Sequence, residues 1–183
     1  MLQSILIIFI YSTFAIDFFI WPIPSEASTK NLIKKNNRPI ALLLALVFIL
    51  NIIFYLSPLF LAVYHLLKNS TELTSKDQFF IGFTFATIGR LTSLFGSHAL
   101  RTSKDLVCEK SIFRFTRNPI SLGMHLTVLG MLIIFNFWYL WAGFLLYLIN
   151  IHYKILIEEK ELIEKYGAPY KAYYSLTPRY LLW

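Results

Sequence analysis

The chain has 183 residues, of which 57% are hydrophobic and only 15% are charged, and its formal net charge is +7 at pH 7. Soluble domains are about 45–50% apolar and about 25% charged, so this composition predicts an integral membrane protein. The positive charges are spread over the segments between apolar stretches, without a nucleic-acid recognition module. They therefore favour anionic lipid headgroups as partners and argue against nucleic acid.

Four long apolar stretches follow one another along the chain: residues 2–21, 39–67, 79–100 and 120–157. The last stretch is about twice the roughly 20 residues that one crossing of a bilayer needs. Asn136, followed by three aromatic residues, is typical of a tight turn at a membrane interface. We therefore divide the last stretch at Asn136 and predict an all-α integral membrane protein with five transmembrane helices, the last two forming a hairpin.

The distribution of basic residues supports the count of five helices. Lysine and arginine gather after the first, third and fifth helices, whereas the other two connections hold only Lys68 and Lys76. Because these residues accumulate in cytoplasmic loops, we predict an outside N-terminus and a cytoplasmic C-terminus. The abundance of Ile, Leu, Asn and Lys is typical of an AT-rich genome and favours a bacterial cytoplasmic membrane.

No linker divides the chain, so we treat residues 1–183 as one membrane domain. Residues 1–100 form three N-terminal helices in this interpretation, and residues 101–183 form the C-terminal half. The helical pattern continues on one face beyond the last apolar stretch, at Ile155, Glu159, Leu162 and Tyr166. We therefore expect the fifth helix to extend into the cytoplasm, with a left-handed cap at Gly167 and a stop at Pro169. A short amphipathic turn follows.

Two polar motifs flank the predicted hairpin. Glu158 and Glu159 lie about one turn past the last apolar run, where a site could meet a soluble cofactor, although Glu158 could simply form an i,i+4 ion pair with Lys154. Asn118 and Pro119 begin the fourth helix, and proline there leaves backbone amide and carbonyl groups free to face a ligand. The plainer alternative is an ordinary helix start.

Arg90 and the four histidines are further polar residues within the apolar stretches. An unpaired cation near the middle of a transmembrane helix is costly, so Arg90 must face the interior of the bundle, with Asp17 as a candidate partner. The histidines show no metal-ligand spacing, and we expect no metal. Neither a Gly-rich phosphate loop nor a nucleophile elbow is present in the sequence.

Taken together, the polar motifs form an ordered series. The chain reads Arg117-Asn-Pro-Ile-Ser-Leu-Gly before the hairpin and, after it, Lys154-x-x-x-Glu-Glu-x-x-Leu, Tyr-Gly, two tyrosines three apart and Thr-Pro-Arg179. This series resembles the isoprenylcysteine carboxyl methyltransferase and phospholipid methyltransferase superfamily of membrane enzymes. The family pattern is Arg-His-Pro-x-Tyr-x-Gly, then Arg-x-x-x-Glu-Glu-x-x-Leu, an aromatic-Gly pair, two tyrosines and Thr-x-Arg. The resemblance covers about the C-terminal half, and it implies that residues 101–183 are the half that binds a cofactor and carries the chemistry.

The resemblance implies a cofactor, S-adenosyl-L-methionine, in a cytoplasmic pocket formed by the ends of the last helices and the tail. The acceptor would be a lipid or lipidated molecule that enters from the bilayer. By matching positions, the cofactor contacts would be Lys104, Asp105, Leu106, Val107, Phe113, Asn118, Pro119, Ile120, Ser121 and Glu158. The catalytic group would comprise Lys154, Glu158, Glu159 and Arg179.

Three positions depart from the family pattern, and they leave the acceptor open. Asn118 replaces histidine, Ser121 replaces tyrosine, and Lys154 replaces an arginine whose planar fork suits a carboxylate. The acceptor is then either a prenylcysteine-like carboxylate or a lipid amine. Two rival functions remain: an NADPH-dependent reductase resembling the steroid reductases, which the Glu158-Glu159 pair disfavours, and a non-catalytic membrane scaffold.

Overall fold

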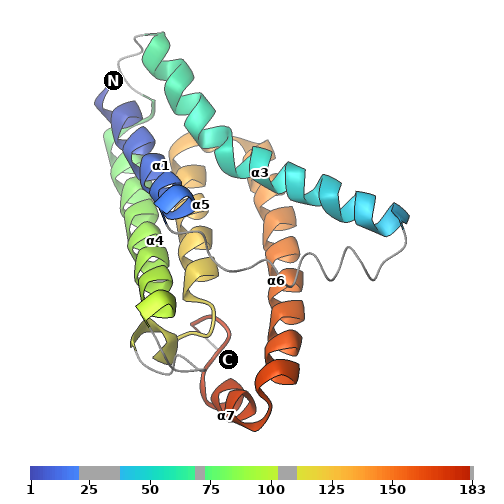
Figure 1. The fold of residues 1–183 in the computed structure, drawn as a ribbon. Coiled ribbons are helices and arrows are strands. Elements are labelled where there is room, and N and C mark those ends of the chain that lie inside the picture. Colours follow the sequence, from blue (N-terminus) through green and yellow to red (C-terminus); the bar gives the residue numbers. More distant parts are fainter. Residues whose placement is uncertain (21–37, 69–72, 103–110, 182–183) are drawn as a thin grey trace.

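The computed structural model describes residues 1–20, 38–68, 73–102 and 111–181. Its five long helices are α1 (Leu2–Ile20), α3 (Arg38–Leu67), α4 (Lys76–Thr102), α5 (Pro119–Phe135) and α6 (Trp138–Tyr166). Two short helices complete these ranges: η1 (Ser111–Arg114) and α7 (Ala168–Leu176). Because the described residues include no strand, the predicted all-α class is confirmed for them. Figure 1 shows the arrangement of the helices.

The predicted division of the last apolar stretch is confirmed. Helices α5 and α6 are separated by Asn136 and Phe137 alone, and Asn136 adopts a left-handed conformation with φ 44° and ψ 35°. Asparagine tolerates this conformation better than most residues. The Asn136 amide donates to the Leu132 carbonyl at 2.7 Å, and the Trp141 indole donates to the Asn136 side chain at 3.2 Å. These bonds fix the turn of the hairpin.

Two of the described helices, α4 and α6, are long and apolar enough to cross a membrane. The other apolar segments among the described residues are shorter: Leu2–Phe14, Ile52–Leu67 and Pro119–Phe135. The 17 residues of α5 rise about 26 Å, slightly less than the roughly 30 Å of hydrocarbon in a bilayer. Two of the five predicted crossings therefore meet the criterion of length and composition.

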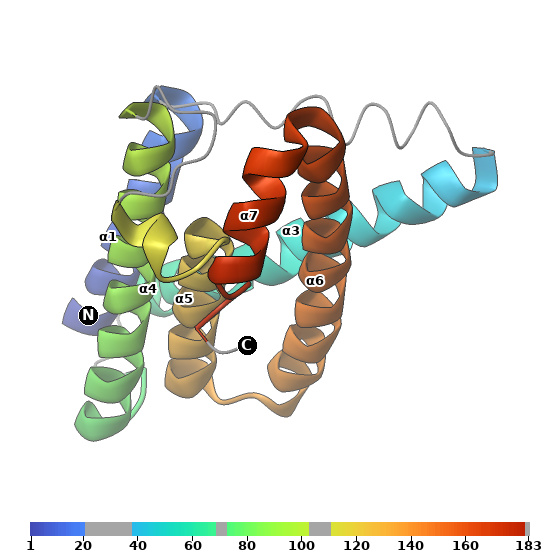
Figure 2. The same ribbon diagram turned by 90° about the horizontal axis from the view of Figure 1, so that it is seen from below.

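Helices α4 and α5 lie side by side (Figures 1 and 2), and a stripe of glycines on each helix faces the other. A Cβ atom on Gly82 would lie 2.5 Å from the Gly130 carbonyl oxygen, and one on Gly89 would lie 2.6 Å from the Gly123 carbonyl oxygen. Only glycine permits backbones to approach so closely, as small residues do in helix pairs within membranes. The glycines recur every seven residues in each helix, a signal that our sequence reasoning did not use.

The predicted inward position of Arg90 on α4 is confirmed, since the residue is only 4% exposed. Its guanidinium donates to the Thr13 hydroxyl at 2.6 Å and to the Ser93 hydroxyl at 3.1 Å. The same group lies over the Phe14 ring, 4.0 Å from the centroid. These contacts join α4 to α1 in a bundle whose core draws on α1, α3, α4, α5 and α6. The Asp17 side chain lies outside the described residues, so its pairing with Arg90 stays a prediction.

The predicted continuation of the fifth helix beyond the last apolar stretch is confirmed, because α6 runs without interruption to Tyr166, while its cytoplasmic position stays a prediction. Gly167 then has a φ of 62°, as a C-terminal glycine should, but its ψ of −132° lies outside the left-handed helical region. Helix α6 ends before Pro169, as predicted, and Pro169 occupies the first turn of the separate helix α7. Figure 2 shows α7 across the end of the bundle that also holds η1 and the start of α5.

Candidate active site

The C-terminal tail, residues 177–181, runs back along the segment that enters α5. The Arg117 amide donates to the Pro178 carbonyl at 2.9 Å, and the Thr116 hydroxyl donates to the Arg179 carbonyl at 3.0 Å. The Asn118 side-chain amide donates to the same Arg179 carbonyl at 3.3 Å. Residues about 60 positions apart in the chain are thereby fixed side by side. Asn118 therefore holds the tail, a task that only a side-chain donor can perform.

An ion-pair cluster of Arg117, Glu159 and Arg179 joins this segment to α6. The Arg179 Nη2 lies 2.7 Å from the Glu159 Oε2, while its Nε donates to both carboxylate oxygens at 3.1 Å. The Arg117 Nη1 lies 3.5 Å from the Glu159 Oε1. These contacts bring the segment that leads into Asn118 and Pro119 together with Glu159 and with the tail. The hydrogen bonds from Arg179 to Glu159 raise the pKa of Arg179.

The cluster carries more positive than negative charge, since two arginines share one carboxylate. Glu159 is 4% exposed, and the Arg117 guanidinium stacks on the Tyr174 ring with its central carbon 3.8 Å from the centroid. The Arg117 Nε and Nη1 atoms are buried, and neither donates a hydrogen bond within the described residues. Buried donors of this kind need an acceptor. A carboxylate or another anion fits these nitrogens.

Glu158 and Lys154 lie on the surface of the same part of α6. The Lys154 Nζ is 3.5 Å from the Glu158 Oε1, and the two side chains are 52% and 34% exposed. This is the i,i+4 pair that the sequence suggested as the plainer alternative. An exposed pair of this kind contributes little to stability, so the Glu158 carboxylate exchanges partners at small cost.

The remaining predicted cofactor residues take several positions. The Phe113 side chain is buried, and its carbonyl accepts a hydrogen bond from the Tyr173 hydroxyl at 2.9 Å, which joins η1 to α7. Pro119 and Ile120 pack against α4 at Gly96, while Ser121 is half-buried on the first turn of α5. The predicted contacts at Lys104, Asp105, Leu106 and Val107 lie outside the described residues.

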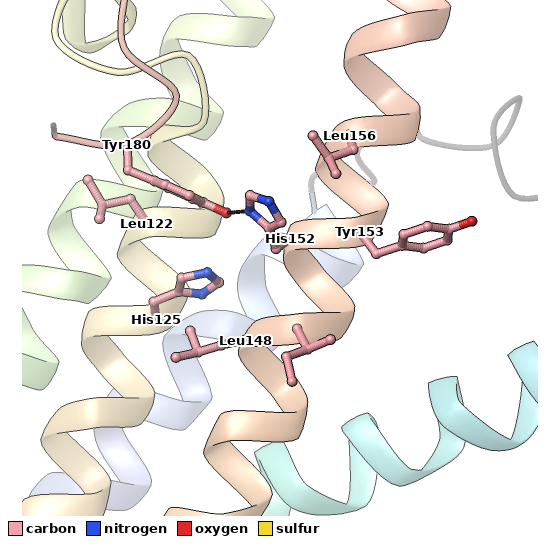
Figure 3. Close-up of a pocket in the computed structure, with 8 residues that line it drawn as sticks. Leu122, His125, Leu148, His152, Tyr153, Leu156 and Tyr180 are labelled. Carbon is pink, nitrogen blue, oxygen red and sulfur yellow. Dashed lines mark hydrogen bonds between the residues drawn. The ribbon is translucent and has the colours of Figure 1, made fainter. Parts of the chain in front are cut away.

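A pocket of about 580 Å³ opens between α5 and α6, and none of its lining residues was among the predicted site residues. Figure 3 shows side chains from both helices and from the tail around it: Leu122, His125, Leu148, Ile149, His152, Tyr153, Leu156 and Tyr180. The sequence held a signal for two of them. His125 follows Asn118 by seven residues, and His152 precedes Glu159 by seven, so both lie about two helical turns into the hairpin.

We considered the histidines in the sequence only as metal ligands. Among the described residues, no three His, Cys, Asp or Glu side chains gather where they could hold a metal ion. Each of the two pocket histidines instead contacts a phenol. The His152 Nδ1 lies 3.2 Å from the Tyr180 hydroxyl, and the His125 Nδ1 lies 3.4 Å from the Tyr147 hydroxyl. Burial raises the pKa of Tyr180, which keeps its hydroxyl protonated.

The structure is a helical bundle in which two helices are long and apolar enough to cross a membrane, and a buried charged cluster lies at one end of its helical hairpin. These features place the protein in the class of integral membrane proteins with a candidate site near the helix ends. Within that class, residues 73–169 match the phospholipid methyltransferase family. The match covers just over half of the chain, which therefore belongs to this family of membrane methyltransferases. No curated protein and no solved structure matches the chain.

Proposed function

We propose that the protein transfers a methyl group from S-adenosyl-L-methionine to a membrane-embedded or lipid-like acceptor. The observation that carries this proposal is the convergence of the α5 entry, α6 and the tail in the cluster of Arg117, Glu159 and Arg179. Membership of the phospholipid methyltransferase family supports the reaction class. The family match gives no support to a reductase.

The chemistry of the side chains at this end of the hairpin fits the cofactor. S-adenosyl-L-methionine bears a carboxylate, an ammonium, ribose hydroxyls and an electrophilic methyl on a sulfonium. The buried Arg117 nitrogens, which have no hydrogen-bond partner among the described residues, suit the carboxylate, and the accessible Glu158 carboxylate suits the hydroxyl or ammonium groups. Asn118, Pro119, Ile120 and Ser121 would line the same site from the start of α5, with Phe113 behind them.

The residues of this chain would act by alignment and by exclusion of water, which is what an in-line displacement requires. Glu159 is engaged by two arginines, so its contribution would be to hold the tail and α6 in register. Glu158 would bind the cofactor, and Lys154 would orient an anionic group of the acceptor by its charge. Arg179 would close the site through Glu159.

We also propose that the chain crosses the bilayer five times, with the N-terminus outside and the C-terminal half of α6 and α7 in the cytoplasm. The basic segments would then all face one side, as the loop charges require. A bacterial cytoplasmic membrane fits the composition. Labelling of a Lys171→Cys variant with a membrane-impermeant thiol reagent tests the orientation. Position 171 is exposed on α7, so its thiol should react only after the membrane is made permeable to the reagent.

Calorimetric titration of the detergent-solubilised protein with S-adenosyl-L-methionine tests the cofactor assignment. The Glu158→Ala variant should lose binding, because it removes the accessible carboxylate next to the cluster. Glu164→Ala is the matched control, since Glu164 is an exposed glutamate on the same helix and should bind as the unmodified protein does. Unchanged affinity in Glu158→Ala would remove Glu158 from the site.

The two rival functions are separated by the same titration. Binding of NADPH in place of S-adenosyl-L-methionine would establish the reductase, and binding of neither would establish the scaffold. Incubation of native membranes with radiolabelled S-adenosyl-L-methionine then identifies the acceptor class. Label in the lipid fraction supports a lipid acceptor, whereas label confined to protein contradicts it.

A further inference from the structure

The C-terminal flap, residues 168–181, comprises α7 and the tail and lies across one end of the bundle (Figure 2). Hydrogen bonds attach it to other elements. The Tyr173 hydroxyl donates to the Phe113 carbonyl of η1 at 2.9 Å, and the Arg117 amide donates to the Pro178 carbonyl at 2.9 Å. Among the described residues, the apolar core of the bundle contains none from the flap. The flap is therefore a separate layer, and its displacement would leave that core intact.

One residue, Gly167, joins the flap to α6. Its φ of 62° and ψ of −132° are a conformation that residues with a side chain rarely adopt. A Cβ atom on Gly167 would meet no atom from another part of the chain within 4 Å, so space does not require the glycine. Its amide donates to the Ile163 carbonyl of α6 at 2.9 Å, and its carbonyl accepts from the Lys171 amide of α7 at 3.1 Å. Backbone freedom is what position 167 supplies, as a hinge between two elements needs.

The flap carries one of the two arginines that share the Glu159 carboxylate. Arg179, on the flap, donates three hydrogen bonds to that carboxylate, whereas the Arg117 Nη1 lies 3.5 Å from it. The Arg117 side chain is only 7% exposed, and its Nε and Nη1 have no hydrogen-bond partner within the described residues. The closed flap thus buries a guanidinium whose charge is only partly balanced, which is unfavourable away from water.

The burial of Arg117 depends on the flap itself. The Tyr174 ring of α7 lies against the Arg117 guanidinium, whose central carbon is 3.8 Å from the ring centroid. The Tyr174 hydroxyl accepts a hydrogen bond from the Arg179 Nη2 at 3.4 Å. Displacement of the flap would remove the ring and the Arg179 charge together, and water would then solvate Arg117. Arg117 alone therefore favours an open flap, whereas an anion bound to it favours the closed one, because a ligand shifts an equilibrium by its differential affinity for the two states.

The charges of the proposed methyl donor decide which of its groups Arg117 can take. The carboxylate of S-adenosyl-L-methionine is its one anionic group, while its ammonium and its sulfonium are cations that Arg117 repels. A carboxylate beside Arg117 would balance the second arginine of the cluster. It would also accept the hydrogen bonds that the buried Nε and Nη1 otherwise lack within the described residues.

We propose that the C-terminal flap is a lid hinged at Gly167, and that Arg117 couples closure of this lid to the carboxylate of the methyl donor. The proposal rests on the proposed methyltransferase function and deepens it by naming how access to that site is regulated. The closed lid excludes water from the site, and the open lid lets the donor and its demethylated product exchange.

Hydrogen–deuterium exchange, read by mass spectrometry in an uncharged detergent, tests the coupling on the unmodified protein. S-adenosyl-L-homocysteine keeps the carboxylate and has no methyl group to transfer. It should slow exchange across residues 168–181 by about tenfold or more, because charge-assisted hydrogen bonds form in the closed state. Saturating decarboxylated S-adenosyl-L-methionine should leave exchange as it is without a ligand. Equal protection by both ligands, or by neither, overturns the proposal.

Arg117→Gln tests whether this arginine is the group that senses the carboxylate. The variant leaves Arg179 and Glu159 as a balanced pair, so it should fold. It should erase the difference between the two ligands, both in protection and in calorimetric affinity. Arg114→Gln is the matched control, since Arg114 is an exposed arginine three residues earlier, and it should retain the difference. A difference that survives in Arg117→Gln overturns the proposal. If the decarboxylated ligand binds too weakly to saturate, the affinities carry the decision.

Gly167→Ala tests the hinge in the ligand-free protein. Alanine rarely adopts the backbone conformation of Gly167, so the flap should leave its place, and exchange across residues 168–181 should rise. Residues 140–163 of α6 should keep their exchange rates. Ser175→Ala, at an exposed position of α7, is the control and should change neither segment. An unchanged flap, or a rise that spreads into α6, overturns the hinge.

The calorimetric titration separates this proposal from the proposed function. Binding of S-adenosyl-L-methionine without protection that depends on a carboxylate leaves the methyltransferase function standing and overturns the lid. Failure to bind any of these ligands overturns the proposed function and, with it, the coupling through Arg117.

Discussion

Arg179 donates three hydrogen bonds to the Glu159 carboxylate, and the shortest joins Nη2 to Oε2 at 2.7 Å. Glu159 belongs to α6, and Arg179 lies 20 residues later, beyond α7, so the contact folds the tail back across the end of the hairpin. Arg117 contacts the same carboxylate from the α5 entry. One buried carboxylate thus joins three segments that are separate in the sequence.

Replacement of Glu159 by glutamine should destabilise the fold. The variant leaves Arg117 and Arg179 without their counter-charge, and loss of one partner of a buried ion pair costs about 3–5 kcal/mol. Glu158→Gln is the matched control, because it breaks an exposed i,i+4 pair of about 0.3–0.5 kcal/mol on the neighbouring position. Chemical unfolding in detergent measures both. Equal losses in the two variants would show that the cluster does not hold the tail.

Substitution of Gly89 by alanine should separate α4 from α5. The added Cβ atom would lie 2.6 Å from the Gly123 carbonyl oxygen, and a backbone atom cannot move aside as a side chain does. Overpacking of this kind costs about 1–3 kcal/mol. At Gly143 the nearest atoms to a new Cβ belong to the Phe54 ring at 2.8 Å, so Gly143→Ala should cost less. Melting temperatures in detergent compare them, and a smaller loss at Gly89 would contradict the packing argument.

Much of the helical layout follows from the sequence because apolar length and turn chemistry are local properties. The split at Asn136 required only a long apolar stretch and a residue that accepts a left-handed conformation. The extension of α6 to Tyr166 required only its helical periodicity. The glycine stripes were overlooked because their meaning depends on a partner helix: Gly89 is informative only when Gly123 is known to lie opposite.

The site was predictable only in part. The order of the motifs placed Asn118 and Glu159 at one end of the hairpin, and the structure brings the segments together. The partner of Glu159 could not be predicted, since several basic residues were equally available along the tail and only the return of the chain after α7 selects Arg179. The pocket histidines were missed for a similar reason. Their phenol partners, Tyr147 and Tyr180, become neighbours only through the tertiary fold.

Alkaline pH should destabilise the protein through Tyr170 on α7. Burial and the nearby Glu159 carboxylate raise the pKa of Tyr170 to about 12 from its ordinary value of 10.0. Because the unfolded chain loses this proton first, the stabilising contribution is complete below pH 10 and is lost as the pH rises to 12. Tyr170→Phe should unfold with a weaker dependence on pH over this window, measured by denaturant midpoints. Tyr139→Phe, an exposed control, should keep the original slope.

Asn118 stands where the related enzymes carry histidine, and its contact with the tail suggests what the two side chains share. The Asn118 amide donates to the Arg179 carbonyl at 3.3 Å, and a histidine ring N–H could donate to the same acceptor. Asn118→His should therefore keep the tail in place, whereas Asn118→Leu, which has no donor, should release it.

Limited proteolysis of the detergent-solubilised protein measures this release, because cleavage after Arg179 needs the tail to leave the α5 entry. Trypsin should cut Asn118→Leu faster at Arg179 than either the unmodified chain or Asn118→His. The loss of one such hydrogen bond is worth about 0.5–1.5 kcal/mol, which corresponds to roughly a 2–13-fold increase in the open population. Equal cleavage rates in all three proteins would show that the Thr116 hydroxyl and the ion-pair cluster hold the tail without Asn118.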